Sequence, residues 1–540
     1  MKAIRRMISA LLVLAMVTGM VPGQVFAEET TATEAVVETT AATEATTEPV
    51  EETTADTEAV TEPVVETTVA TEAVTEPAVS EEMLDSSAIP EVTQGTCGDN
   101  LTWKLKNGVL TISGSGDMNS YSPGETPWCD SSYLITQVVL PKGLTSIGGY
   151  AFHNCGITYI SIPETVTHIG VGAFFNCASL SQVAIPESVT SISGYAFNGC
   201  GNLRMMHSPD EENIGDYYNK QIVAIPSTVT AIGAQAFFGC AQIRQLILPE
   251  GIASIGDSAF SYCSGLKEVV LPESITYIGE YVFDNCTGLV SATLPSAITT
   301  LPRGMFAYCS SLTDIEIPAT VTTIDHQVFR DCSALTDAVL PGGLTTLGSV
   351  VFENCTGLTS ITIPAGVSTI GSGTFSGCTS LTDATIANGV SVIGDQMFSA
   401  CTGLTKIIVP DSVTIIGESA FHGCKALTEV VLPDGLVEIG WSAFAMTALS
   451  QIALPDTVTT IGDNAFYGSK LTEIILPHGL KKIGVYTFTA CSGLTKVLIP
   501  INVTTIDTMA FMGCVALTDV YYCGSEEAWK NITIGPSNDL

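Results

Sequence analysis

A unit of 23 residues repeats along most of this chain and constrains its fold more than any other feature. Residues 271–293 read LPESITYIGEYVFDNCTGLVSAT, and the next two residues begin the same pattern again. Because so short a unit cannot bury its own apolar side, its copies must stack on one another. The sequence therefore predicts an elongated repeat solenoid. The phenylalanine of an A-F-x-x-C segment marks each of sixteen copies: Phe152, Phe174, Phe197, Phe237, Phe260, Phe283, Phe306, Phe329, Phe352, Phe375, Phe398, Phe421, Phe444, Phe466, Phe488 and Phe511.

Each copy contains one clear strand signal. The segment L-T-x-V-x-L-P, as at 427–433, alternates apolar and polar positions and is rich in β-branched residues, which predicts a short strand that ends at the proline. The A-F-x-x-C segment, as at 420–424, is too short for a stable isolated helix. We expect it to form a single helical or 3-10 turn.

The N-terminal 95 residues do not share the repeat. Residues 1–27 join Lys2, Arg5 and Arg6 to an apolar run and a small-residue site ending at Ala27, which predicts a secretory signal peptide. No later stretch is apolar enough to span a bilayer. Residues 28–95 are rich in Thr, Glu and Pro and hold no aromatic, Cys, Lys or Arg, which predicts a disordered acidic stalk. Its threonines leave O-glycosylation open.

Two segments flank the repeats. Residues 96–139 carry Asn107-Gly108 between alternating apolar runs, a strong signal for a β-hairpin, with Trp103 and Trp128 nearby. We expect this segment to cap the array, which occupies 140–520, and residues 521–540 to form a C-terminal cap. Uncapped, the terminal repeats would leave an apolar face and a strand edge open.

The chain is strongly acidic. Its formal net charge is −36, from 19 Lys and Arg against 55 Asp and Glu. Such a charge repels nucleic acid and anionic membrane surfaces, so neither is an expected partner. We expect a monomer that is secreted or extracellular, with association with a cell surface left open, and no membrane insertion of the mature form.

The full pattern, L-x-x-[VI]-x-[LI]-P-x-x-[VI]-T-x-I-G-x-x-A-F-x-x-C, resembles the BspA-like bacterial leucine-rich repeats over 140–520. The segments 98–128 and 520–535 also resemble pieces that flank such arrays. The resemblance implies a leucine-rich repeat solenoid with a parallel β-sheet on its inner face and short helical or 3-10 turns opposite. It also implies a surface-exposed binding or adhesive role with no catalytic residues. Ala387, Pro302, Thr447 and Ser469 depart from the pattern and read as tolerated drift.

Fourteen of the 17 cysteines occupy one repeat position. Stacking would align them in a ladder whose parallel Cβ vectors fit a disulfide poorly, and no histidine accompanies them at metal-ligand spacing. We interpret them as small apolar core residues. Cys97 and Cys129 lie outside the ladder, which leaves a disulfide between them open, and Cys523 has no obvious partner. The ladder comprises Cys155, Cys177, Cys200, Cys240, Cys263, Cys286, Cys309, Cys332, Cys355, Cys378, Cys401, Cys424, Cys491 and Cys514.

The sequence contains no catalytic constellation. Its six histidines fall at different repeat positions without a recurring nucleophile or carboxylate, and phosphate-loop, nucleophile-elbow and zinc-protease motifs are absent. We therefore expect neither an enzyme nor a cofactor or metal site.

Outward positions of the predicted strands are the better candidates for function. Four residues before each proline runs a polar, mostly acidic column, and two before it runs a mostly apolar one, a combination that suits a basic protein or peptide. A merely solvated β-surface is the alternative. The candidate surface comprises Gln245, Ile247, Glu268, Val270, Asp314, Glu316, Asp337, Val339, Asp383, Thr385, Glu429, Val431, Glu473 and Ile475.

One irregular insert, 210–221, interrupts the repeats inside the 40-residue interval from Phe197 to Phe237. Strand-like segments lie on both sides of it, so a shortened coil without A-F-x-x-C is expected there. We favour a decayed repeat, because loops tolerate change; the alternative is a functional insert, since insertions that project from a regular scaffold often carry function. The candidate residues are Asp210, Glu211, Glu212, Asp216, Tyr217 and Tyr218.

These observations favour a secreted or cell-surface binding protein that acts in adhesion or protein–protein interaction. The expected partner is a host or microbial surface protein, with a glycan left open. The alternative is a carbohydrate-associated or structural accessory protein of an extracellular degradation system.

Overall fold

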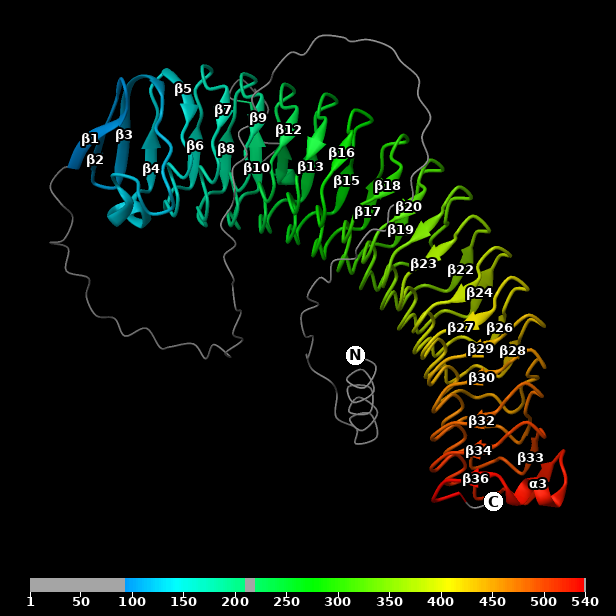
Figure 1. Ribbon diagram of the computed structural model, residues 1–540. Helices are drawn as coiled ribbons and strands as arrows, with labels where there is room; N and C mark the ends of the chain where they lie inside the picture. The colour runs from blue at the N-terminus through cyan, green and yellow to red at the C-terminus, as the bar shows by residue number, and fades with distance from the viewer. Residues whose placement is uncertain (1–92, 209–218, 539–540) are drawn as a thin grey trace, which may run out of the picture. The chain divides into compact units, whose positions relative to one another are not determined.

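A computed structural model describes residues 93–208 and 219–538 of the chain. The predicted signal peptide, residues 28–92 of the predicted stalk and nearly all of the insert lie outside these ranges. The last three residues assigned to the stalk, 93–95, instead belong to the first strand of the N-terminal sheet. The described coils stack in sequence order along a solenoid (Figure 1). In this part of the chain no helix is both long and apolar enough to cross a membrane.

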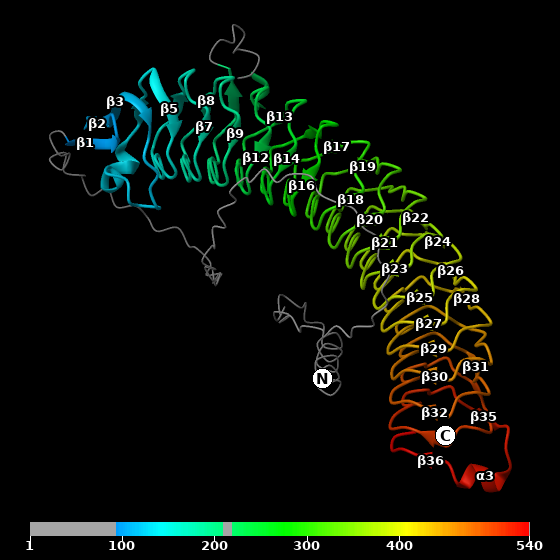
Figure 2. The ribbon, with the colours of Figure 1, turned by 45° about the horizontal axis from the view of Figure 1, so that its top comes forward.

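Two ladders of short parallel strands run along the solenoid, one on either side of the proline that ends each predicted strand (Figure 2). Partner residues in neighbouring coils are usually 23 positions apart, as in Glu268 opposite Ser291. The first ladder contains β4 (Gln137–Val139), β6 (Tyr159–Ser161), β8 (Gln182–Ala184), β10 (Met205–His207), β11 (Ile222–Ala224), β13 (Gln245–Ile247), β15 (Glu268–Val270), β17 (Ser291–Thr293), β19 (Asp314–Ile315), β22 (Ser360–Ile363), β24 (Asp383–Ile386), β26 (Lys406–Ile408), β28 (Glu429–Val431), β31 (Glu473–Ile475), β33 (Lys496–Ile499) and β35 (Asp519–Tyr522).

The second ladder follows the proline and ends near the I-G step. It contains β5 (Gly143–Ile147), β7 (His168–Ile169), β9 (Ser191–Ile192), β12 (Ala231–Ile232), β14 (Ser254–Ile255), β16 (Tyr277–Ile278), β18 (Thr300–Leu301), β20 (Thr323–Ile324), β21 (Thr346–Leu347), β23 (Thr369–Ile370), β25 (Val392–Ile393), β27 (Ile415–Ile416), β29 (Glu438–Ile439), β30 (Thr460–Ile461), β32 (Lys482–Ile483), β34 (Thr505–Ile506) and β36 (Thr533–Ile534). Most of these strands have only two residues, which is why the sequence pattern did not reveal them as a ladder of their own.

The A-F-x-x-C segments form consecutive β-turns rather than the helical or 3-10 turn that we expected. Around Phe152, Tyr150 and Asn154 adopt left-handed φ values of 52° and 58°. The amide of Cys155 donates within its own coil, to the carbonyl of Phe152. The amides of Phe152 and Asn154 donate instead to the next coil. In a helical turn, successive amides would donate to carbonyls of the same segment, whereas here every second amide donates to a carbonyl of the next coil.

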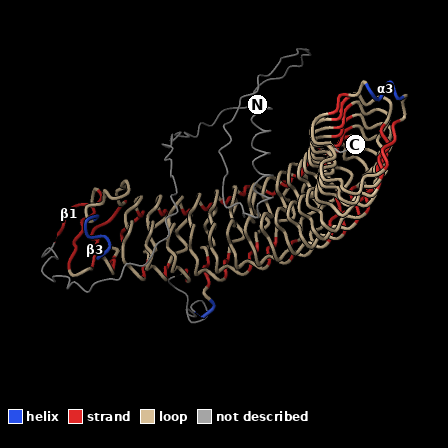
Figure 3. The backbone as a smooth tube through the Cα atoms, turned by 90° about the horizontal axis from the view of Figure 1, so that it is seen from below, coloured by secondary structure: helices blue, strands red, loops and turns tan. Residues whose placement is uncertain are grey.

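A stack of buried phenylalanines forms the centre of the core. Rings in neighbouring coils lie 5.2–5.9 Å apart between centroids and within 21° of parallel, from Phe152 to Phe511. The stack contains all sixteen predicted phenylalanines, so the solenoid has about sixteen turns. Almost none of the described chain is helical, as Figure 3 shows.

The long interval between Phe197 and Phe237 adds a strand to one ladder only. Both β10 and β11 join the first ladder, between β8 and β13. In the second ladder β9 pairs directly with β12, and the rings of Phe197 and Phe237 stack at 5.3 Å. The interval is therefore a shortened coil that contributes a strand but no second-ladder segment and no phenylalanine.

An antiparallel sheet precedes the first coil. It contains β1 (Thr93–Gly98), β2 (Leu101–Lys106) and β3 (Val109–Asp117), and β2 and β3 are joined by Asn107-Gly108. Both turn residues have positive φ, as a two-residue hairpin of this type requires. A short 3-10 helix, η1 (Cys129–Leu134), follows, and the only described α-helix outside the array, α3 (Glu526–Lys530), lies after the last first-ladder strand.

Candidate binding surface

Many strands of the first ladder alternate buried and exposed side chains, although β10 is buried throughout and β8 and β11 are largely buried. In β15, Val269 is buried, whereas Glu268 and Val270 are exposed, Val270 to 61%. This period of two follows from the pleat of a strand. Stacking then aligns the outward positions of successive coils into the two columns that the sequence predicted.

The structure places the fourteen candidate residues on this outward face, but in separate runs of strands. Thirteen are exposed, and Gln245 is half-buried. One run of this surface is joined by strand pairing without a break. Gln245 lies opposite Glu268, Glu268 opposite Ser291, and Ser291 opposite Asp314. Asp337 and Val339 lie in a coil where the first ladder has no regular strand, although Val339 is 72% exposed.

Two lysines that we did not count interrupt the acidic column. Lys406 lies opposite Glu429, and its Nζ is 2.6 Å from the Glu429 carboxylate. Lys496 lies opposite Glu473 and places its Nζ 5.6 Å from the centroid of the Tyr521 ring. The column is therefore mixed in charge toward the C-terminal end. Listing each copy at the position four residues before proline would have revealed both lysines.

A groove of about 570 Å³ crosses the outward face of three successive coils. Strands β24, β26 and β28 contribute Asp383, Thr385, Ile408 and Val431, and Asp411 lies beyond the proline of the middle coil. This volume falls within the range of ligand-binding pockets. The groove joins three of the predicted surface residues, Asp383, Thr385 and Val431, in one concave site.

The groove forms where the repeat pattern is broken. At Ala387 the usual proline is absent, and the freed amide donates to the carbonyl of Ile363 at 3.1 Å, so β24 continues to Ile386. Two residues later Gly389 has a φ of 126°, which a residue with a Cβ would adopt only under strain. A Cβ at Gly389 would also lie 2.4 Å from the carbonyl oxygen of Ala365. What we interpreted as drift at Ala387 therefore shapes the wall of the groove.

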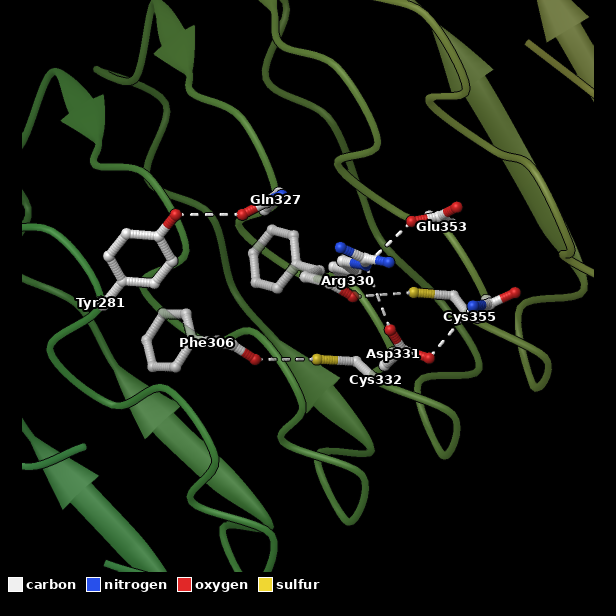
Figure 4. A network of polar contacts seen from close by, with 10 residues as sticks. Tyr281, Phe306, Gln327, Arg330, Asp331, Cys332, Glu353 and Cys355 are labelled. Carbon is white, nitrogen blue, oxygen red and sulfur yellow. Dashed lines mark hydrogen bonds and ion pairs between the residues drawn. The ribbon is translucent and has the colours of Figure 1, made fainter. Parts of the chain in front are cut away.

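A separate polar cluster lies on the turn segments (Figure 4). The Nε of Arg330 is 2.8 Å from the Glu353 carboxylate and 3.3 Å from that of Asp331. Its guanidinium also lies 5.7 Å from the centroid of the Tyr308 ring. Burial raises the pKa of Glu353, and Arg330 opposes that rise. All charges in this cluster are already paired, so it joins three coils and is not a free binding site.

The remaining cysteine and insert predictions have different outcomes. Cys97 and Cys129 are free thiols in the structure. Cys97 is buried, whereas the Sγ of Cys129 lies near its own neighbour, 3.8 Å from the carboxylate of Asp130. The candidate residues of the insert, Asp210 to Tyr218, lie outside the described residues. Within the described ranges, no group of three or more His, Cys, Asp or Glu side chains could hold a metal ion.

Stacked coils of parallel strands with an exposed, mixed polar and apolar face define the class of leucine-rich repeat solenoids. A model of the BspA type leucine rich repeat region matches residues 129–221, 216–336, 299–428 and 414–533, so the chain belongs to this family. Members of the family are generally binding scaffolds rather than catalysts.

Several solved bacterial structures are similar to this chain. A leucine-rich repeat protein from Bacteroides ovatus has 27% identity and a TM-score of 0.50, covering 78% of this chain and 93% of its own. One from Eubacterium ventriosum has 24% identity and a TM-score of 0.40, covering 71% and 96%. A leucine rich cell surface protein from Faecalibacterium prausnitzii has 23% identity and a TM-score of 0.34, covering 83% and 99%. A search of curated proteins found no match.

Proposed function

We propose that this chain is a secreted or cell-surface, non-catalytic protein that binds other proteins through the outward face of its first ladder, in adhesion or a related interaction. The observation that carries the proposal is the pair of exposed columns, one polar and one apolar, which meet in the groove over β24, β26 and β28. Isolated apolar side chains are common on protein surfaces. A column of them at 23-residue spacing, next to carboxylates, suits a partner of complementary pattern.

The rest of the chain supports presentation of this face. The leader at 1–27 would direct export, and the acidic segment 28–92 would separate the array from its point of attachment. The sheet of β1 to β3 and the residues after 520 would cap the ends of the solenoid, which keeps it soluble and monomeric. The proposed partner is a protein on a host or microbial surface.

Binding of the purified chain to matrix proteins, intact cells and immobilised glycans tests this function. Two double variants distinguish the faces: Val270→Asp with Ile408→Asp changes the first ladder, and Tyr277→Asp with Val392→Asp changes exposed positions of the second. We expect protein or cell binding that the first pair abolishes and the second pair retains. No binding across the panel would contradict the proposal. Retention only on polysaccharide, competed by soluble sugar, would support the carbohydrate-associated alternative.

A further inference from the structure

The groove over β24, β26 and β28 has an uneven distribution of charge that indicates what it binds. Lys406 lines it, but its ammonium is engaged with Glu429 at 2.6 Å. Asp383 and Asp411 also line it, are exposed, and form no ion pair with any described residue. The charges available to a ligand in the groove are therefore two carboxylates.

The two carboxylates lie toward opposite ends of the strands. Asp383 begins β24, and the residue 23 positions later, Lys406, begins β26. Asp411 follows Lys406 by five residues, a separation of at most about 17 Å in an extended chain. The apolar side chains of Ile408 and Val431, opposite each other in register and 56% and 44% exposed, line the space between. The pattern along the strand direction is thus acid, apolar surface, acid.

We propose that this groove binds an extended, basic segment of a protein, in which two cationic side chains flank an apolar one on the same face. In an extended segment, residues i, i+2 and i+4 share a face and span about 13 Å, and flexible lysine or arginine stems cover the remaining distance. The cations would pair with Asp383 and Asp411 while the central side chain packs on Ile408 and Val431. This inference rests on the proposed function and names its partner class.

The absence of proline at Ala387 is a second observation, independent of charge, that supports a site in this coil. A proline ring there would fill part of the groove and remove the hydrogen bond from the Ala387 amide to Ile363. The neighbouring coils keep their prolines, Pro364 and Pro410. Ala387 lines the groove at the position where most coils have a proline.

Three peptides test the proposal by fluorescence anisotropy with the full chain. The probe is Lys-Thr-Val-Thr-Lys, whose lysines and valine share a face when it is extended. Thr-Lys-Val-Lys-Thr has the same composition but places the lysines on the opposite face from the valine, and Glu-Thr-Val-Thr-Glu reverses the charge. We expect the probe to bind about tenfold more tightly than either control and its binding to weaken with salt.

Three variants test whether the probe peptide binds in the groove. Asp383→Asn with Asp411→Asn should weaken the probe about tenfold, because each change removes a charge without changing shape. Asp314→Asn with Asp337→Asn, on the same face outside the groove, should leave it unchanged. Ala387→Pro should also weaken the probe, and thermal unfolding would show that the variant is folded. Equal binding of the two lysine peptides, or equal effects of the two Asp→Asn pairs, would overturn the proposal.

These outcomes are separable from those of the proposed function. A chain that binds proteins or cells in the panel but does not distinguish the peptides has a binding face elsewhere, and the groove proposal fails alone. Competition of the probe by a soluble glycan, with no effect of a basic protein, would also overturn the assignment to a protein segment.

Discussion

The Sγ of Cys177 donates a hydrogen bond of 3.0 Å to the backbone carbonyl of Phe152, in the preceding coil. That carbonyl also accepts the amide of Cys155 in its own coil. The same relationship recurs at later coils, for example from Cys309 to Phe283 and from Cys514 to Phe488. The cysteine ladder is therefore more than small apolar packing, because every ladder thiol after Cys155 joins its coil to the one before.

Replacing one ladder thiol should separate its packing from its hydrogen bond. For Cys309→Ala we expect a loss of about 1–2 kcal/mol in the free energy of unfolding, from the cavity and the lost donor. Cys309→Ser should lose less, because the hydroxyl can still donate; Ser469 already occupies this position in another coil. Urea unfolding measures both variants. A serine variant less stable than the alanine variant would show that apolar packing alone matters.

Thiol labelling should distinguish two cysteines, Cys129 and Cys523, from the buried ones. Cys523 is exposed and Cys129 partly exposed, whereas Cys97 and the ladder cysteines are buried. With a maleimide at pH 7 to 8, we expect rapid modification of Cys129 and Cys523 only, and modification of all 17 cysteines after unfolding. Mass spectrometry of the digest identifies the sites. Protection of Cys129 that is lost on reduction would indicate that it does form a disulfide.

The ladder should also make the fold sensitive to alkali. Burial raises the pKa of Cys263 and of Cys424 from 9.0 to about 12. Between these values the unfolded chain ionises its thiols while the folded chain keeps them protonated, so the folded state binds more protons and stability falls as pH rises. Below pH 9 this contribution is fully present. Urea midpoints from pH 8 to 11 should fall, and less steeply for a variant with Cys378, Cys401 and Cys424 changed to Ser.

Trp128 should be essential for the N-terminal end of the solenoid. Its indole Nε1 donates to the carbonyl of Ala151 at 2.9 Å, and its ring lies 6.4 Å from that of Phe152 and stacks with it. Trp128→Ala would remove both contacts and uncover the first phenylalanine of the stack, at a cost of about 3–5 kcal/mol. Trp128→Phe keeps an aromatic ring and should cost less. Light scattering together with thermal unfolding would show whether the uncovered end associates.

The Arg330 cluster should contribute to stability through charge as well as packing. Arg330→Met keeps much of the side-chain stem but leaves Glu353 and Asp331 without their cation. Since these side chains are only partly exposed, we expect a loss of about 1–2 kcal/mol, between the values for surface and buried pairs. Lys530→Met breaks the exposed pair with Glu526 and should change nothing measurable. If both variants unfold alike, the Arg330 contacts contribute no net stability.

Much of the architecture could be predicted because the same weak strand signal recurs in every copy of the repeat, and this recurrence resolves the ambiguity of a single copy. One copy of L-x-x-V-x-L-P is a weak strand signal, but sixteen copies at constant spacing leave stacking as the only way to bury Leu, Ile and Phe. The extra strand near Met205 and the Asn107-Gly108 turn followed from equally local chemistry. The turns at Phe152 were predicted wrongly, because whether an amide bonds within its coil or to the next coil depends on the neighbouring coil.

By itself the sequence determined the repeat, the buried positions, the outward columns and the acidic balance, since all of these follow from periodicity and composition. Only the tertiary structure decided how the columns are used. It paired Lys406 with Glu429, left Asp383 and Asp411 without an ion pair to any described residue, and placed Ala387 in the wall of a groove. These features depend on which side chains of different coils become neighbours, and that is set by the register between strands 23 residues apart and not by any single copy of the repeat.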